Sequence, residues 1–256
     1  MTVSWLLAVG ALAGITLLGV LWWRERAEAT RLRRRLEDAA GNLEHLQRTF
    51  SRFVPEAVVE QVIAGGLPAG ERKEVTALFA DLAGFTPLAE RIEPTLLVEI
   101  LNDYFERMSR AITEHRGRVS TFLGDGILAL FGAFEPNPWQ GDDAVRAALA
   151  MREELADYNR ELAEKGLPNL AFGVGLHRGV GVAGLVGSRE KKEFAIVGRT
   201  VNVAARVQDL TRQHDADILV TEDLARTLDS HFSLRPLPAA ELRGIAKPVA
   251  VYAVER

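Results

Sequence analysis

The hydrophobic pattern of the chain begins with a stretch over residues 3–23 that contains no charged side chain. As a helix this stretch would be roughly 31 Å long, about the thickness of the hydrocarbon core of a bilayer. Tryptophans stand near both of its ends, and six arginines follow between residues 24 and 35. Indoles favour the headgroup region and arginines favour the cytoplasmic side. We therefore expect residues 1–23 to anchor the chain in the cell (inner) membrane by a single pass, with the rest in the cytoplasm. A cleaved signal peptide fits less well, because no basic residue precedes the stretch and arginine follows it at once.

Apolar residues then recur at alternating spacings of four and three from Leu32 to Phe53. This is the heptad spacing of a coiled coil. A helix packed on its own domain would show a similar stripe, but this one begins ahead of the globular part of the chain. We interpret residues 24–70 as a short parallel coiled coil followed by a linker, whose last residues, 64–70, are rich in glycine and also contain Pro68.

From residue 71 to residue 256 the pattern alternates between strands and helices. Buried strands are expected at 75–80, 118–123, 127–131, 170–177, 181–186 and 194–197, and helices at 94–114, 142–164 and 200–211. The order β-α-β-β-α-β is that of the ferredoxin-like arrangement. The sequence thus predicts an α+β domain with helices over one face of a sheet.

Composition narrows the possible chemistry. The chain is 48% hydrophobic and 26% charged, which is typical of a globular protein, and its net charge of −4 argues against a nucleic-acid partner. It has no cysteine. Disulfides, thiolate metal sites and cysteine nucleophiles are therefore excluded, and any divalent metal must be bound by carboxylates, carbonyl groups or histidine.

Two aspartates stand where strands are expected to end. Asp81 follows the first strand, and Asp125 lies in a Gly-Asp-Gly turn between two apolar runs. The first strand of a ferredoxin-like sheet lies beside that hairpin, so both carboxylates are expected at one sheet edge. Paired carboxylates suit Mg²⁺ or Mn²⁺. Each residue taken alone could equally be a strand-end cap or the first residue of an Asp-Gly turn.

Three blocks carry a specific resemblance. Residues 79–86 (FADLAGFT), 124–125 (GD) and 197–206 (VGRTVNVAAR) resemble the signature blocks of class III nucleotidyl cyclases, the adenylate and guanylate cyclase family. Residues 50–55, 175–179 and 242–252 also fall in family order, so the resemblance covers roughly residues 50–256. Its members of bacterial type, with one transmembrane helix, are the most similar in organisation.

The resemblance implies a reaction and a set of roles. In this family the 3′-hydroxyl of a nucleoside triphosphate attacks its own α-phosphate and pyrophosphate leaves, with two Mg²⁺ or Mn²⁺ ions in each active site. Asp81 and Asp125 match the metal-binding aspartates, and the Leu82 carbonyl would be a backbone ligand. Asn202 matches the asparagine that holds the ribose, and Arg206 matches the arginine that stabilises the transition state. Without the blocks, a helix cap and a surface ion pair would be the simpler interpretations of these last two residues.

The resemblance also implies positions that contact substrate, two of which depart from the family pattern. These positions are Phe85, Thr86, Thr121, Ala195, Arg243 and Lys247. Thr121 replaces a lysine and Ala195 replaces an aspartate or threonine that read adenine in adenylate cyclases. Threonine reaches a base only at short range and alanine cannot hydrogen-bond to it. ATP remains the expected substrate, with GTP or a pyrimidine nucleotide as alternatives.

In this family each site forms between two subunits, so the expected assembly is a homodimer. Asp81 and Asp125 would come from one chain and Asn202 and Arg206 from the other. A catalytically silent module that only dimerises or binds nucleotide is the alternative from another class. A dinucleotide site at the GVGVAG run of residues 179–184 is rejected, because no helix is expected after it.

Overall fold

The computed structural model describes residues 23, 41, 70–188, 192–245 and 247–255, with backbone only for residues 192–194. The chain divides into two units, Met1–Val59 and Glu60–Arg256. The expected anchor, apart from residue 23, and the expected coiled coil and linker, apart from residues 41 and 70, lie outside the described residues. Within the described part of the chain, no helix is long and apolar enough to cross a membrane.

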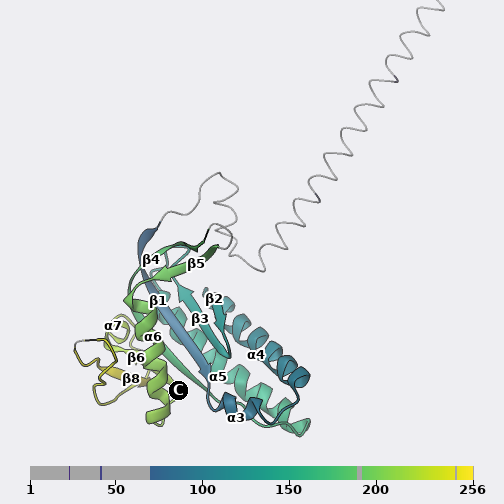
Figure 1. Cartoon of the computed structure of the whole chain (residues 1–256). Coiled ribbons are helices and arrows are strands. Elements are labelled where there is room, and N and C mark those ends of the chain that lie inside the picture. The colour runs from purple at the N-terminus through teal and green to yellow at the C-terminus, as the bar shows by residue number, and fades with distance from the viewer. Residues whose placement is uncertain (1–22, 24–40, 42–69, 189–191, 246, 256) are drawn as a thin grey trace, which may run out of the picture. The chain divides into compact units, whose positions relative to one another are not determined.

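One eight-stranded sheet forms the centre of the second unit (Figure 1). Its strands are β1 (Glu71–Leu82), β2 (Arg118–Leu123), β3 (Gly126–Phe131), β4 (Phe172–Gly187), β5 (Lys192–Val197), β6 (Ile218–Thr221), β7 (Leu234–Pro236) and β8 (Val251–Val254). Their order in the described sheet is β2-β3-β1-β4-β6-β8-β7, and β5 pairs with β4. The first four strands therefore have the ferredoxin-like arrangement that the sequence predicts.

The helices in the described residues are α3 (Phe85–Ala89), α4 (Pro94–Glu114), α5 (Gln140–Glu164), α6 (Arg199–Asp209) and α7 (Glu222–Ala225), with the 3₁₀ turn η1 (Leu210–Gln213) directly after α6. The bounds of α4 agree with the prediction at both ends. Its start is fixed locally, because the Glu93 carboxylate accepts a hydrogen bond of 3.0 Å from the Leu96 amide and Pro94 occupies the first helical position.

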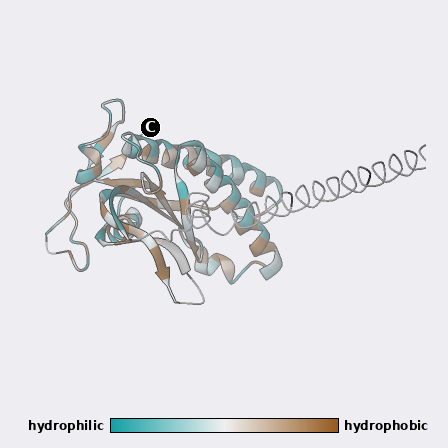
Figure 2. Cartoon of the chain, turned by 90° about the horizontal axis from the view of Figure 1, so that it is seen from above, coloured by the Kyte–Doolittle hydropathy of each residue, from teal (hydrophilic) through white to brown (hydrophobic). Residues whose placement is uncertain are grey.

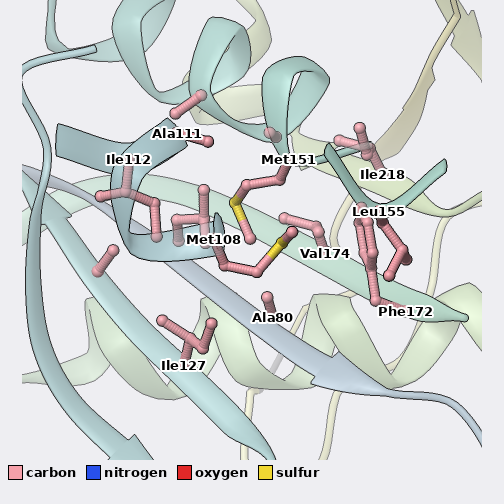
Figure 3. Packing of buried hydrophobic residues seen from close by; sticks show 14 of the residues in the cluster. Ala80, Met108, Ala111, Ile112, Ile127, Met151, Leu155, Phe172, Val174 and Ile218 are labelled. Carbon is pink, nitrogen blue, oxygen red and sulfur yellow. The ribbon is translucent and has the colours of Figure 1, made fainter. Parts of the chain in front are cut away.

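The two faces of the sheet carry different helices. Side chains alternate along β1, so Leu78 and Ala80 pack against α4 and α5, whereas Ala77 and Phe79 belong to the cluster that includes Ala204 of α6. Figure 3 shows Met108 and Met151, from α4 and α5, meeting above Ala80 in the first of these clusters. The expectation of helices over one face holds for α4 and α5. It is wrong for α6, which packs on the other face.

Strand β4 is continuous, where the sequence pattern predicts two strands. It pairs with β1 along the whole of Glu71–Leu82, and its distal half pairs with β5. Glycine weakens a strand through entropy but keeps both backbone hydrogen-bonding groups, so the unbroken ladder with β1 carries β4 through the predicted break at residues 178–180. The GVGVAG run lies inside this strand, which agrees with the rejection of a dinucleotide site.

Figure 2 shows hydrophobic residues along the strands of the sheet, and a polar clamp made by Arg152 adds to the packing between the layers. Arg152 of α5 donates from Nε and Nη2 to the Asp217 carboxylate at 2.8 and 2.6 Å, and from Nη2 to the Val254 carbonyl at 3.1 Å. The clamp thereby ties the middle of α5 to the start of β6 and the end of β8. Buried strand residues and the inner stripe of α5 form the core beneath it.

Candidate active site

Asp81 and Asp125 lie at one edge of the sheet, at the ends of neighbouring strands. Asp81 is next to last in β1, and Asp125 occupies the turn between β2 and β3. Because Ala80 pairs with Ile127, Gly126 lies beside Asp81. A Cβ added at Gly126 would be 3.2 Å from Oδ1 of Asp81, so this carboxylate closely approaches the turn that holds Asp125. The structure thus brings the two aspartates together.

The electrostatic setting of Asp81 is unfavourable for a negative charge. Burial raises the pKa of the Asp81 carboxyl above its usual value, and the charge of Asp125 raises it further. Asp209 acts in the same direction, whereas Arg212 lowers this pKa. Such a shift means that the carboxylate form is penalised here. A cation beside the two aspartates would therefore be stabilising.

These groups fit a divalent metal site of the magnesium type. Mg²⁺ and Mn²⁺ prefer oxygen ligands, and Mg²⁺ is usually bound by one or two carboxylates together with water and substrate phosphates. Asp81 and Asp125 supply two carboxylates, and Leu82, next in β1, supplies the backbone carbonyl that the resemblance assigns. Within the described ranges no cluster of three or more His, Cys, Asp or Glu side chains that could hold a metal ion occurs.

The side chain of Arg212, a cation from the same chain, forms an ion pair with Asp81 at this site. Nη2 of Arg212, in η1, donates to Oδ2 of Asp81 at 3.0 Å. The guanidinium carries one positive charge and donates to one of the two oxygen atoms of the Asp81 carboxylate. It shows that the geometry around Asp81 accepts a positive group.

Asn202 and Arg206 lie elsewhere in the same chain. They are one helical turn apart on α6, so they share a face of that helix. The Arg206 guanidinium lies against Gly244, where an added Cβ would be 3.6 Å from Nη1. Gly244 has a φ of 72°, in the left-handed region that favours glycine. Within one chain the structure therefore groups Arg206 with the 242–244 turn, whereas Arg212 is the arginine that pairs with Asp81.

The expected base-reading positions lie on separate strands. Thr121 is half-buried on β2, and its hydroxyl donates to the Phe122 carbonyl at 3.3 Å. Ala195 is half-buried on β5, opposite Gly184 of β4. Of the two, only Thr121 has a side chain that can hydrogen-bond to a base.

The other expected substrate contacts lie close in sequence to the aspartate pair or on the turns near α6. Phe85 and Thr86 begin α3, directly after Gly84, whose φ of 69° turns the chain away from β1. Arg243 is exposed, directly before Gly244, and lines a surface pocket with Glu241. Lys247 is exposed in a second pocket, lined also by Arg199 and Asp223. Arg243 is thus brought toward Arg206, and Lys247 toward the start of α6.

Two residues near the aspartates were missed by the sequence analysis. Tyr104 is completely buried on α4, and burial, followed by the charges of Asp81 and Asp125, raises the pKa of its hydroxyl. The pattern assigns Tyr104 only to the apolar stripe of α4. Arg212 lies 131 positions from Asp81 in the sequence, and periodicity carries no signal for such a pair.

The comparisons with known proteins agree with this arrangement. Residues 67–256 match the model of the adenylate and guanylate cyclase catalytic domain. The chain is 33% identical over 219 residues to an adenylate cyclase of Anabaena cylindrica, covering 81% of this chain and 43% of that protein. It is 31% identical over 209 residues to adenylate cyclase 1 of Rhizobium meliloti (strain 1021), covering 80% of this chain and 31% of that protein. The chain spans less than half the length of these two curated relatives.

Solved structures give the same assignment. The fold matches the guanylyl cyclase Cya2 with a TM-score of 0.69 and 30% identity, over 73% of this chain and 94% of that one. It matches the adenylyl cyclase CyaB from P. aeruginosa with a TM-score of 0.70 and 26% identity, over 74% of this chain and 97% of that one. With a family model that matches three quarters of its residues, an α+β fold shared with cyclase structures and the aspartates of the first two blocks side by side, the chain belongs to the adenylate and guanylate cyclase catalytic domain family.

Proposed function

We propose that this protein is a metal-dependent nucleotidyl cyclase that converts a nucleoside triphosphate, with ATP as the first candidate, into a 3′,5′-cyclic nucleotide and pyrophosphate for second-messenger signalling. The observation that carries the proposal is the meeting of Asp81 and Asp125 at one sheet edge, with an electrostatic demand for a cation there. Two Mg²⁺ or Mn²⁺ ions, when bound, would neutralise phosphate charge and make the 3′-hydroxyl a better nucleophile.

The side chains of the protein would then bind and orient the nucleotide. In the reaction the 3′-oxygen forms a bond to the α-phosphorus, and the bond from that phosphorus to the pyrophosphate oxygen breaks. Asn202 would hold the ribose by hydrogen bonds. Arg206 would place a planar, permanently charged group against the α-phosphate as negative charge develops there.

The active site would be shared between two chains. The family resemblance assigns Arg206 and the aspartates to different chains, and within one chain Arg206 lies against Gly244 while Arg212 pairs with Asp81. A two-fold homodimer supplies this complement twice, giving two equivalent sites. A catalytically silent module is disfavoured, because Asp81, Asp125, Asn202 and Arg206 are all present.

Base specificity has a second candidate. The two similar curated proteins named above are adenylate cyclases, which favours ATP. Thr121 stands where adenylate cyclases have an adenine-reading lysine, and Ala195 stands where they have an aspartate or threonine. The loss of both side chains favours an enzyme for GTP or a pyrimidine nucleotide.

We further propose that residues 1–23 anchor the enzyme in the cell membrane, with residues 24–70 as a dimerising coiled coil and linker and residues 71–256 as the catalytic domain in the cytoplasm. Recovery of the full chain in the soluble fraction would contradict the anchor.

One experiment tests the chemistry and the shared site together. The purified full chain is incubated with each of the four nucleoside triphosphates and Mn²⁺, and the cyclic product is identified by mass spectrometry. Asp125→Ala and Arg206→Ala should each lower the rate by at least about 100-fold without unfolding the domain, as expected for metal-binding and transition-state groups. A mixture of the two variants should regain activity, because one of the two sites in the mixed dimer is intact.

The outcomes separate the alternatives. Wild-type activity in a folded single variant would contradict the role assigned to that residue. A mixture that exchanges subunits and stays inactive would contradict the shared site. The absence of a cyclic product from all four nucleotides would support the silent module.

A further inference from the structure

Arg212 occupies a defined position beside the aspartate pair. It lies in η1, directly after α6, and its side chain is 55% exposed, whereas that of Asp81 is 23% exposed. The 3.0 Å ion pair therefore reaches from the surface into a partly covered carboxylate. None of the roles proposed above uses this arginine.

Two features of the fold set the position of Arg212. Gly173 of β4 is the register partner of Asp81, and a Cβ added there would be 2.1 Å from Oγ1 of Thr211. The missing side chain lets η1 lie directly on β4. Thr211 is buried, and its hydroxyl donates to the Gln208 carbonyl at 2.7 Å, which fixes the turn. The next residue is Arg212, which the close contact delivers to Asp81.

The ion pair and a metal ion would share the Asp81 carboxylate, whose Oδ2 accepts from Arg212 and whose Oδ1 approaches the turn that holds Asp125. Oδ1 of Asp81 approaches the turn that holds Asp125, so two carboxylates lie close together and both gain from a nearby cation. Arg212 supplies that cation from within the chain, and a divalent ion would supply it from solution. Two cations held against one carboxylate repel each other, so the guanidinium at Oδ2 weakens the binding of a divalent ion and the ion weakens the binding of the guanidinium. The half-exposed side chain is free to turn outward, and Asp209, three residues earlier, offers it another carboxylate.

We propose that Arg212 is a built-in competitor of the metal: it neutralises Asp81 in the metal-free protein and leaves when the metal and its nucleotide enter. The proposal rests on the assignment of Asp81 as a metal ligand. It implies that the free enzyme binds divalent ions more weakly than the aspartate pair alone would. Premature filling of the site by a bare metal ion is thereby reduced, and metal that arrives with the nucleotide is favoured.

The test measures metal binding directly and does not depend on turnover. The full chain, without nucleotide, is titrated with Mn²⁺, and the free ion is followed by its electron paramagnetic resonance signal. Arg212→Ala should lower the Kd for Mn²⁺ about fivefold. This change corresponds to the loss of a partly exposed ion pair whose interaction energy lies at the strong end of the usual range. The matched control is Arg110→Ala, which removes an arginine of 48% exposure that pairs with Glu154 at 2.9 Å on the surface of α4 and α5. Its Kd should equal that of the wild type.

Asp81→Asn separates this proposal from the one on which it rests. If Asp81→Asn loses Mn²⁺ binding and Arg212→Ala gains it, both assignments are supported. If Asp81→Asn loses binding while Arg212→Ala binds Mn²⁺ as the wild type does or more weakly, the competitor role is wrong and the metal site stands. If Asp81→Asn binds Mn²⁺ as the wild type does, the metal assignment itself fails and the competitor role with it. Equal tightening in Arg212→Ala and Arg110→Ala would reduce the effect to net charge and would also overturn the proposal.

Discussion

Gly175→Ala tests whether the close approach of α6 to the sheet is required by the fold. Gly175 lies near the start of β4, opposite Phe79 of β1. An added Cβ would be 2.3 Å from the Ala204 carbonyl oxygen and 2.3 Å from the Gln208 amide nitrogen, both backbone atoms of α6. Ordinary contact begins at 3.4 Å, so the helix would have to retreat by about 1 Å. No rotamer change can relieve a clash between a Cβ and a helix backbone.

The expected loss of stability follows from this geometry. Overpacking a well-packed core costs about 1–3 kcal/mol, and a clash with backbone belongs at the upper end. Replacing glycine by alanine also restricts the unfolded chain, which offsets about 0.4–1 kcal/mol. The net destabilisation is about 2 kcal/mol, so Tm should fall by about 4–8 °C for a domain of this size. Activity should fall further than stability alone explains, because α6 also carries Asn202 and Arg206.

Thermal unfolding of the full chain, followed by circular dichroism, measures the effect. The matched control is Gly70→Ala, whose Cβ would be 3.0 Å from Cγ1 of Val182, an exposed side chain that can move. Gly70→Ala should leave Tm within about 2 °C of the wild type. A Tm for Gly175→Ala that matches the control would refute the reasoning, because the α6 backbone would then have room that the structure denies it.

Two further predictions concern residues away from the aspartates. Burial is the main cause that lowers the pKa of the His177 imidazole from 6.5 to about 4. The unfolded chain therefore binds a proton at His177 more readily than the folded chain, and stability is lost as pH falls from 6.5 toward 4. Urea denaturation at pH 7 and pH 4.5 should therefore show about 2–3 kcal/mol more acid destabilisation in the wild type than in His177→Gln, and equal losses would contradict the shift. Arg152→Ala breaks the clamp from α5 to β6 and β8 and should cost about 1–2 kcal/mol of unfolding free energy. The exposed Arg160→Ala, which loses only a surface pair with Asp157, should cost less than about 0.5 kcal/mol.

Local signals predicted most of the elements of the domain. The apolar stripe of helical period predicted the bounds of α4, and the structure shows the Glu93 cap and Pro94 fixing the same start. The break predicted inside β4 is wrong. The ladder that carries β4 across residues 178–180 is made with β1, whose residues are far away in the sequence. A periodicity argument does not contain them.

The candidate site shows the same division. Asp81 and Asp125 were placed together from topology alone, since a strand and the hairpin beside it must share an edge. The roles of Asn202 and Arg206 came from the resemblance, because helix position by itself favours a cap and a surface ion pair. Neither the topology argument nor the family resemblance predicted the contact of Arg212 with Asp81. Its contact depends on how deeply η1 settles on β4, which is a property of packing and not of any local pattern.

Packing and electrostatics are therefore linked through the glycines of β4. Gly175 admits α6, and Gly173, two residues earlier on the same face, admits η1. Since η1 continues α6 without a break, a helix pushed outward at Gly175 carries Arg212 away from Asp81. The Gly175→Ala variant should then resemble Arg212→Ala in Mn²⁺ binding while differing from it in Tm. Gly173 and Gly175 therefore do more than permit close packing. The close packing of α6 and η1 on β4 places the Arg212 guanidinium beside Asp81 before a metal ion binds.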